Sequence, residues 1–381
     1  MAGKDKECFS GFESIADREK LLLARFAIHS TDTKGRKYAE PVQEYRGPFQ
    51  RDRDRIIHTA AYRRLSHKTQ VFTNELGDYH RNRLTHTLEV CSIARTIARA
   101  LKLNEDLVEA MALMHDIGHP PFGHSGEDAL NECLIDDGGF SHNRHALRIV
   151  EVLETRYPDF PGLNLSLETL EGQQFRAAKK DANASPSLEA QVVDAADSIA
   201  YDSHDADDAL ELGLLDIAQL TEVSIWSNAV TKVSEGRELS PVLLRRSVAH
   251  ELIDVQVKDL LGNTMLKLDR LQLRSAEEIK KLPPVVGHSE QIMHQKKDLE
   301  SFLMHNVYRH PNVINVRDSA QQALRNLFEI LKSNPHLLPE NYRLRSKEIG
   351  LHRTIGDYIA GMTDRFAWRE HARLVTTSDD E

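Results

Sequence analysis

The stretch His115-Asp-Ile-Gly-His-Pro-Pro-Phe-Gly-His-Ser-Gly-Glu127 decides the fold of this chain. It concentrates side chains that bind metals or carry protons in one short segment. These side chains belong to His115, Asp116, His119, His124 and Glu127. Imidazole and carboxylate groups are costly to bury unless each has a partner, and a divalent metal is a partner that both groups bind.

A buried helix is predicted directly before this stretch. Asn104 is a suitable N-cap, and apolar residues then recur at helical spacing at Leu107, Met111 and Met114. Gly118 and the two prolines that follow it end the helix. We therefore expect the His-Asp pair at the end of an apolar helix, on a turn held by glycine and proline.

The His-Asp pair by itself has a simpler explanation. A histidine at a helix C-terminus interacts favourably with the negative end of the helix dipole. The pair indicates a metal site only if further ligands come from distant parts of the chain.

The composition is that of a globular protein with a large core. The chain has 381 residues, of which 40% are hydrophobic and 28% charged, and its net charge is -10. Any anionic ligand therefore needs a local basic pocket. The three cysteines, Cys8, Cys91 and Cys133, are too few and too scattered for a disulfide framework or a cysteine zinc site. The start does not resemble a signal peptide and no apolar run is long enough to span a membrane, so a cytoplasmic protein is expected.

Two further helices carry possible distant ligands. A helix with an apolar stripe is predicted to start near Arg83, and it places His86 in its first turn. A second helix, over residues 187–212, carries Asp197, Tyr201 and Asp205 at spacings of four, so the three share one face. Asp197 lies among alanines and an isoleucine, where a carboxylate needs a metal or a cation as its partner. For the later acidic residues of this helix, a face toward water is the simpler explanation.

The N-terminal region and the basic segment after it are less informative. Residues 1–50 are expected to form an arm, with one helix over residues 14–28. From Arg51 to Lys68 the sequence predicts a helix with cations along one side. Such a stripe is usually a solvated face with Arg–Asp pairs, and the alternative is phosphate recognition.

The rest of the chain predicts further helices and almost no strands. Amphipathic runs cover residues 223–261 and 320–332, and a last helix is expected over residues 357–366. We therefore expect an all-α fold, with residues 51–381 as a single domain. Within it, a metal core would occupy about 51–215 and a helical C-terminal part 216–381.

The order His86, His115-Asp116, Asp197 gives two imidazoles and two carboxylates on apolar helices. This set suits a six-coordinate ion such as Mn, Fe or Mg with open positions for water. It suits a closed structural zinc site poorly, because such sites favour cysteine.

With these motifs, the chain resembles the HD-domain metal-dependent phosphohydrolases, and among them the bacterial dGTPase-like deoxynucleoside triphosphate triphosphohydrolases. The matching phrases are residues 63–72, 83–90, 115–124, 193–202 and 356–365. The resemblance implies an HD-domain helical bundle with additional C-terminal helices. It also implies a divalent metal, Mn or Mg first, with Fe, Co, Ni or Zn as alternatives.

The resemblance implies a role for each matching residue. The metal would be held by His86, His115, Asp116 and Asp197. His124 and Glu127 would serve the attacking water and the leaving oxygen, with His119 and His142 near the phosphates. Substrate would further contact Arg83 through a phosphate, Tyr201 under the sugar, and Gln70 and Asp205 at the 3′-hydroxyl. Ser198 stands where some animal relatives carry a phosphate-binding lysine, so regulation by nucleotides need not transfer.

The implied reaction converts a deoxynucleoside triphosphate and water to a deoxynucleoside and tripolyphosphate. Single-stranded DNA or a dNTP could act as effector, and a homo-oligomer, a hexamer by resemblance, is expected. Two alternatives stay open at this point. One is another HD phosphohydrolase, a nucleotidase or cyclic-nucleotide phosphodiesterase, and the other is a module that only senses nucleotides or single-stranded DNA.

Overall fold

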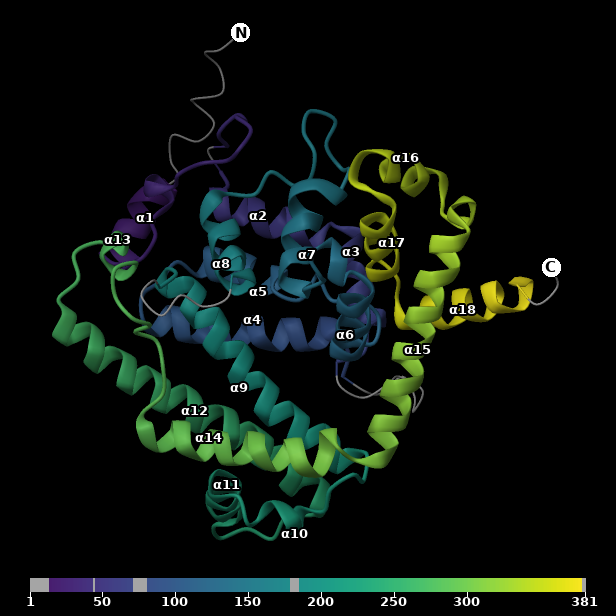
Figure 1. Ribbon diagram of the computed structural model, residues 1–381. Helices are drawn as coiled ribbons and strands as arrows, with labels where there is room; N and C mark the ends of the chain where they lie inside the picture. The colour runs from purple at the N-terminus through teal and green to yellow at the C-terminus, as the bar shows by residue number, and fades with distance from the viewer. Residues whose placement is uncertain (1–13, 44, 71–80, 179–184, 379–381) are drawn as a thin grey trace.

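The computed structural model describes residues 14–43, 45–70, 81–178 and 185–378. Residues 1–13 of the predicted arm, which include Cys8, lie outside these ranges. So do residues 71 and 72, the last two of the first matching phrase. Within them there is no strand, and only two isolated bridges, which join Arg36 to Ser166 and Thr69 to Asn82. The prediction of an all-α fold is confirmed (Figure 1).

The centre of the molecule is built from α4 (Arg83–Ala100), α5 (Glu105–Met114) and α9 (Leu188–Glu211). Each begins at a side-chain cap, because Asn82, Asn104 and Ser187 accept hydrogen bonds from free N–H groups of the first turn. α4 packs against α5 and α9, and α2 (Pro48–Ile57) packs against α5. Their apolar sides form one buried cluster, so the three helices that carry the motifs are held rigidly together.

The N-terminal region is partly built into this core. The predicted helix over residues 14–28 is too long: α1 (Ile15–Leu22) ends early, and Leu21 and Leu22 are exposed. The chain then turns inward, where Ala27 and Phe49 are buried in the central cluster.

The basic segment is broken into α2, α3 (Ala60–Arg64) and one 3-10 turn at Leu65–His67. Its arginines pair with carboxylates: Arg55 contacts Glu40 at 2.6 Å, and Arg53 contacts Asp54 at 3.0 Å. The ion pairs of the simpler explanation are therefore present, but Arg55 is buried, so this part of the face is not solvated.

A second group of helices covers the C-terminal half of α9. It comprises α10 (Ile217–Leu220), α11 (Ser224–Ser234), α12 (Pro241–Leu271) and α14 (Glu290–Leu303). The short helix α13 (Ala276–Ile279) instead packs on the central cluster through Ile279. Trp226 is fully buried in the apolar cluster between α9, α11, α12 and α14. A π-helical turn, Met304–Tyr308, then leads from α14 into α15.

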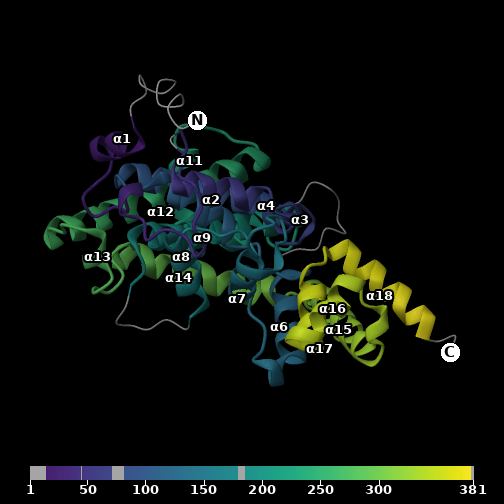
Figure 2. The ribbon, with the colours of Figure 1, turned by 90° about the horizontal axis from the view of Figure 1, so that it is seen from above.

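The last helices pack beside the helix that follows the His-Asp turn. α15 (Pro311–Ser333), α17 (Leu351–Ala360) and α18 (Asp364–Ser378) form an apolar cluster with α6 (Gly123–Cys133), and α16 (Glu340–Ile349) packs on α17. Figure 2 shows α15–α18 gathered beside α6 at one side of the molecule. The predicted helix over residues 357–366 is wrong, because the chain breaks after Ala360 and restarts at Asp364. The break brings the Asp364 carboxylate to the turn before α6.

Two remaining helices lie near the motifs. α7 (His142–Arg148) continues into a π-helical segment, Ile149–Leu153, and it contacts α8 (Leu167–Ala177). Neither helix is long and apolar enough to span a membrane, and the same holds for every helix among the described residues.

Candidate metal centre

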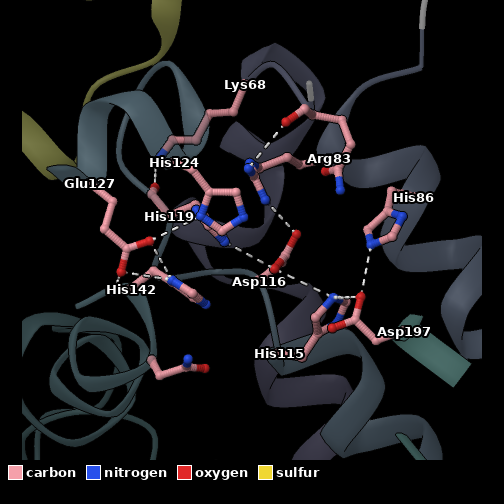
Figure 3. A network of polar contacts seen from close by, with 12 residues as sticks. Lys68, Arg83, His86, His115, Asp116, His119, His124, Glu127, His142 and Asp197 are labelled. Atoms are coloured by element: carbon pink, nitrogen blue, oxygen red, sulfur yellow. Dashed lines mark hydrogen bonds and ion pairs between the residues drawn. The ribbon is translucent and has the colours of Figure 1, made fainter. Parts of the chain in front are cut away.

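The structure brings the four predicted ligands together from three helices. His86 comes from α4, His115-Asp116 from the end of α5, and Asp197 from α9 (Figure 3). The Asp197 Oδ1 atom lies 3.1 Å from His86 Nε2 and 3.7 Å from His115 Nε2. The Asp116 Oδ1 atom lies 3.4 Å from His115 Nε2. Ligand atoms of His86, His115 and Asp116 all lie within 4.8 Å of one another, a spacing that one metal ion can bridge.

The turn that carries His115-Asp116 requires glycine. At Gly118 an added Cβ would lie 2.0 Å from the backbone oxygen of His142. The turn can therefore approach the start of α7 only because this residue has no side chain. His115, Asp116 and His119 are all buried by this packing.

The orientation of His115 fits a metal ligand. Its Nδ1 atom lies 2.6 Å from the backbone oxygen of Ala112, so Nδ1 carries the hydrogen and donates it. Its Nε2 atom then presents a lone pair, and that atom is buried without a hydrogen-bond partner. Ligating histidines commonly fix their tautomer through such a carbonyl, and a buried lone pair without a partner is costly unless a cation fills the place.

The two carboxylates are held in their anionic form. Burial alone raises the pKa of Asp116, but His115, Arg83 and His119 outweigh burial and hold the pKa well below its usual range. Burial likewise raises the pKa of Asp197, and here His115 and Arg176 reverse the effect. Two anionic carboxylates beside two imidazoles therefore form a donor set that fits a divalent cation such as Mn or Mg.

Each of these carboxylates is also paired with an arginine. Arg83 donates through Nη1 to Asp116 Oδ2 at 2.7 Å and through Nη2 to the backbone oxygen of Gln70 at 3.4 Å. The side chain of Arg83 is fully buried, and its predicted phosphate contact stays a prediction. Arg176, near the end of α8, donates to Asp197 Oδ2 at 2.5 Å. The sequence motifs did not indicate Arg176, because α8 carries no pattern that relates it to α9.

A second cluster lies directly beside the metal ligands. It consists of His119, His124, Glu127 and His142, whose ligand atoms also lie within 4.8 Å of one another. His119 connects the two groups, because its Nε2 atom lies 3.3 Å from Asp116 Oδ1 and its ring stacks on His142 at 3.8 Å between centroids. Figure 3 shows this cluster on the other side of Asp116 from His86 and Asp197.

Glu127 organises the second cluster. It lies 2.8 Å from His142 Nδ1 and 3.3 Å from His124 Nδ1, and it accepts the backbone N–H of His142 at 2.9 Å. Burial raises the pKa of Glu127, but the hydrogen bonds from His124 and His142 outweigh burial and hold the pKa well below its usual range. An ionised carboxylate only accepts, so both Nδ1 atoms donate and both Nε2 atoms are free to exchange protons. The His124 side chain is exposed.

The start of α6, which carries His124 and Glu127, is fixed by residues distant in sequence. Phe122 adopts a left-handed conformation with φ 64°, and its N–H donates to Asp364 at 2.9 Å. Asp364 also accepts the Thr69 N–H at 2.7 Å. The buried Lys68 amine donates to the backbone oxygens of His119 and Ala360 and thereby ties the turn to α17. Burial lowers the pKa of Lys68 to about 7.

Further along α9, Asp205 has a partner that the sequence motifs did not indicate. The Tyr308 hydroxyl, from the π-helical turn before α15, donates to Asp205 Oδ2. The Tyr308 ring stacks on Tyr201 with centroids 6.2 Å apart. Asp205 is buried, and burial raises its pKa to about 7. The backbone oxygen of Gln70 accepts from Arg83, and its side-chain oxygen is buried without a hydrogen-bond partner.

The comparisons with known proteins agree with this architecture. The HD domain family matches residues 83–202, and a phosphohydrolase-associated domain matches residues 286–373. A deoxyguanosinetriphosphate triphosphohydrolase-like protein from Thiobacillus denitrificans is 43% identical over 373 residues, covering 94% of this chain and 98% of that protein. Proteins with the same description from Geobacter metallireducens and Nitrosomonas europaea are also 43% identical, each covering 94% of this chain and 96% and 99% of their own lengths.

The three relatives span nearly the whole chain. The HD domain match contains the four predicted metal ligands, the second cluster and Tyr201. The phosphohydrolase-associated match contains Tyr308 and Asp364, and both contact residues of the HD match: the Tyr308 ring stacks on Tyr201, and Asp364 accepts the N–H of Phe122. The chain belongs to the deoxyguanosinetriphosphate triphosphohydrolase-like family of HD-domain phosphohydrolases.

Proposed function

We propose that this chain is a metal-dependent triphosphohydrolase that converts a deoxynucleoside triphosphate and water to a deoxynucleoside and tripolyphosphate. One observation carries the proposal: Asp116 lies between the candidate metal ligands and the histidine cluster of His119, His124 and His142. Its Oδ1 atom lies 3.4 Å from His115 Nε2 on one side and 3.3 Å from His119 Nε2 on the other. A protein that only binds nucleotides has no need of both groups side by side.

His86, His115, Asp116 and Asp197 would hold the cation. A divalent cation in that position would polarise a phosphate oxygen and make a water molecule more acidic. The two arginines on Asp116 and Asp197 add positive charge next to it, which favours the binding of a polyanion such as a triphosphate.

The second cluster supplies the proton. Hydrolysis at the α-phosphorus forms a bond to the oxygen of water and breaks the bond to the 5′-oxygen, which must gain a proton. His124 is exposed, and its Nδ1 atom is held by Glu127, so its Nε2 atom is positioned to donate that proton. His119 and His142, stacked together, would lie along the phosphates.

The α9 face would select the sugar. Tyr201 is one helical turn from Asp197, and Asp205 is one turn further. A ribose attached to an α-phosphate at the metal position would lie against the Tyr201 ring, which leaves little room for a 2′-hydroxyl. Asp205, together with Gln70, would bond the 3′-hydroxyl, and Tyr308 would share in this contact through Asp205.

Product analysis tests the proposal directly. The four dNTPs would be incubated singly and mixed with Mn²⁺, Mg²⁺ or Co²⁺, and the phosphorus products separated by anion exchange and identified by ³¹P NMR. We expect tripolyphosphate and the deoxynucleoside. Release of monophosphate with pyrophosphate, or hydrolysis only of monophosphates or cyclic nucleotides, would contradict the proposal and favour another HD phosphohydrolase. Tight nucleotide binding without products would favour a sensing module.

We also propose that the protein is cytoplasmic and works as a homo-oligomer, a hexamer by family resemblance, whose activity single-stranded DNA or a dNTP could modulate. Light scattering with and without dNTP and metal measures the assembly. A monomer under all of these conditions would contradict this part of the proposal.

A further inference from the structure

The two carboxylate ligands share one arrangement of their oxygens. Asp197 turns Oδ1 toward His86 and His115, and its Oδ2 atom is held by Arg176 at 2.5 Å. Asp116 turns Oδ1 toward His115 and His119, and its Oδ2 atom is held by Arg83. In each case one oxygen faces two imidazoles, and a guanidinium contacts the other oxygen.

Arg176 is placed for this contact by its own surroundings. It lies near the C-terminus of α8, where a cation is favoured, and it also contacts Asp194 Oδ1 through Nε at 3.2 Å. Its Nη1 atom is buried without a hydrogen-bond partner. Asp194 and Asp197 lie three residues apart on α9, so the guanidinium spans one turn of the helix that carries the metal ligand.

The geometry points to a positioning role for this arginine. A carboxylate can bind a metal ion through one oxygen or through both. We propose that Arg176 restricts Asp197 to its Oδ1 atom and thereby keeps a coordination position open for water or a substrate oxygen. The same contact fixes the rotation of the Asp197 side chain toward His86.

This inference rests on the metal centre and not on the identity of the substrate. The central quantities in its test are therefore the affinity for Mn²⁺ and the number of water molecules that exchange on bound Mn²⁺. Both quantities are measured without substrate, so they can still be determined if the protein does not hydrolyse dNTPs.

The test uses Arg176→Met in the full chain, which removes the charge and keeps most of the apolar length. Titration calorimetry gives the Mn²⁺ affinity, and water-proton relaxation at saturating Mn²⁺ gives the number of exchangeable waters. We expect Asp197 to bind through both oxygens, so that Mn²⁺ affinity is retained or increased while one exchangeable water is lost. Turnover at saturating Mn²⁺ should fall roughly 10–100-fold, as for other residues that orient metal ligands.

Two control variants separate this role from a general effect on the fold. Arg245→Met removes a comparable buried arginine that contacts Asp207 and Glu211 of the same helix α9, but no metal ligand. It should leave the water count and the Mn²⁺ affinity unchanged. Arg176→Lys keeps one charged donor and should restore the lost water.

Two results would overturn the proposal. One is an unchanged water count and turnover in Arg176→Met. The other is loss of Mn²⁺ binding in a variant whose circular dichroism matches the wild type, because Arg176 would then build the site and not limit Asp197. If Arg176→Met does not fold, Arg176→Gln, which keeps a polar side chain without the charge, is judged by the same criteria.

Discussion

Asp197 and Asp205 lie two turns apart on α9 and differ sharply in their electrostatic environment. His115 and the guanidinium of Arg176 hold the pKa of Asp197 well below its usual range, although burial acts in the opposite direction. Asp205 forms no ion pair with another described residue, and burial raises its pKa to about 7 even though Tyr308 donates a hydrogen bond to it. One helix face therefore presents an anion to the metal position and a carboxyl group that titrates near neutral pH further along.

The raised pKa of Asp205 predicts a pH-dependent stability. The folded pKa of about 7 lies above the unfolded value near 3.9, so the folded state binds more protons between these two values. The stabilisation is complete below the unfolded pKa and is lost as the pH rises through 7, by at most about 1.4 kcal/mol per pH unit. Asp205→Asn should remove this dependence.

Urea unfolding of the wild type and Asp205→Asn between pH 5 and pH 8 measures the effect. As the pH rises, the unfolding free energy of the wild type should fall relative to that of Asp205→Asn. Asp254→Asn, an exposed site on α12, is the matched control and should follow the wild type. Parallel curves for the wild type and Asp205→Asn would show that Asp205 titrates in its ordinary range.

The aromatic ring of Tyr201 predicts a preference for deoxyribose. Tyr201→Ala should lower the ratio of kcat/KM for dGTP over GTP, because the ring that excludes a 2′-hydroxyl is gone, while bound metal stays at the wild-type level. Tyr201→Phe keeps the ring and should keep the ratio. An unchanged ratio in a folded, metal-loaded Tyr201→Ala would mean that the ring does not read the sugar.

At the level of elements, local signals predicted the helices that carry the motifs. α5 starts at the predicted cap Asn104, and α4 and α9 carry the predicted apolar periodicity, so the helices that hold the four candidate metal ligands could be predicted. Helix ends that depend on tertiary contacts could not be predicted. The chain breaks between α17 and α18, where Asp364 accepts hydrogen bonds from Thr69 and Phe122. The sequence around Asp364 contains no pattern that predicts these two partners.

Dependence on tertiary contacts also explains why some site residues could not be predicted from the sequence. Arg176 and Tyr308 meet α9 only because α8 and the π-helical turn pack against it. Lys68 stood out as one cation of a basic segment, yet its amine is buried against two backbone oxygens. Contacts of this kind depend on the folded arrangement and leave no periodic pattern.

The bonds of Asp364 predict that the C-terminal helices position α6. Asp364→Ala leaves the buried N–H groups of Thr69 and Phe122 without an acceptor. Each unpaired N–H group should lower the unfolding free energy by about 1–3 kcal/mol. Turnover should fall more than Mn²⁺ affinity, because α6 carries His124 and Glu127 but none of the four metal ligands.

Urea unfolding, Mn²⁺ titration and steady-state turnover of Asp364→Ala test this together. Asp318→Ala, exposed on α15, is the control and should match the wild type in all three. If Asp364→Ala loses metal affinity and turnover to the same extent, the C-terminal helices support the whole site and not α6 specifically.

At the level of the molecule, the site is assembled from both matched families. The HD domain match contains the four predicted metal ligands and the second cluster, while the phosphohydrolase-associated match contains Tyr308 and Asp364. Three apolar clusters hold these parts. α9 contributes side chains to the central cluster and to the cluster around Trp226, while the turn after α5 places Ile117 in the central cluster and Phe122 in the cluster of α6 and the C-terminal helices. The division into an arm, a metal core and a C-terminal part remains a prediction.

The central claim is that His86, His115, Asp116 and Asp197 hold one catalytic divalent metal. The most direct measurement compares bound metal and turnover in the wild type and Asp197→Ala after chelation and reloading with Mn²⁺. Metal content would be read by mass spectrometry after gel filtration. We predict that the wild type regains metal and dNTP turnover together, and that Asp197→Ala regains neither. Full turnover with stoichiometric metal in folded Asp197→Ala would remove Asp197 from the site and contradict the account.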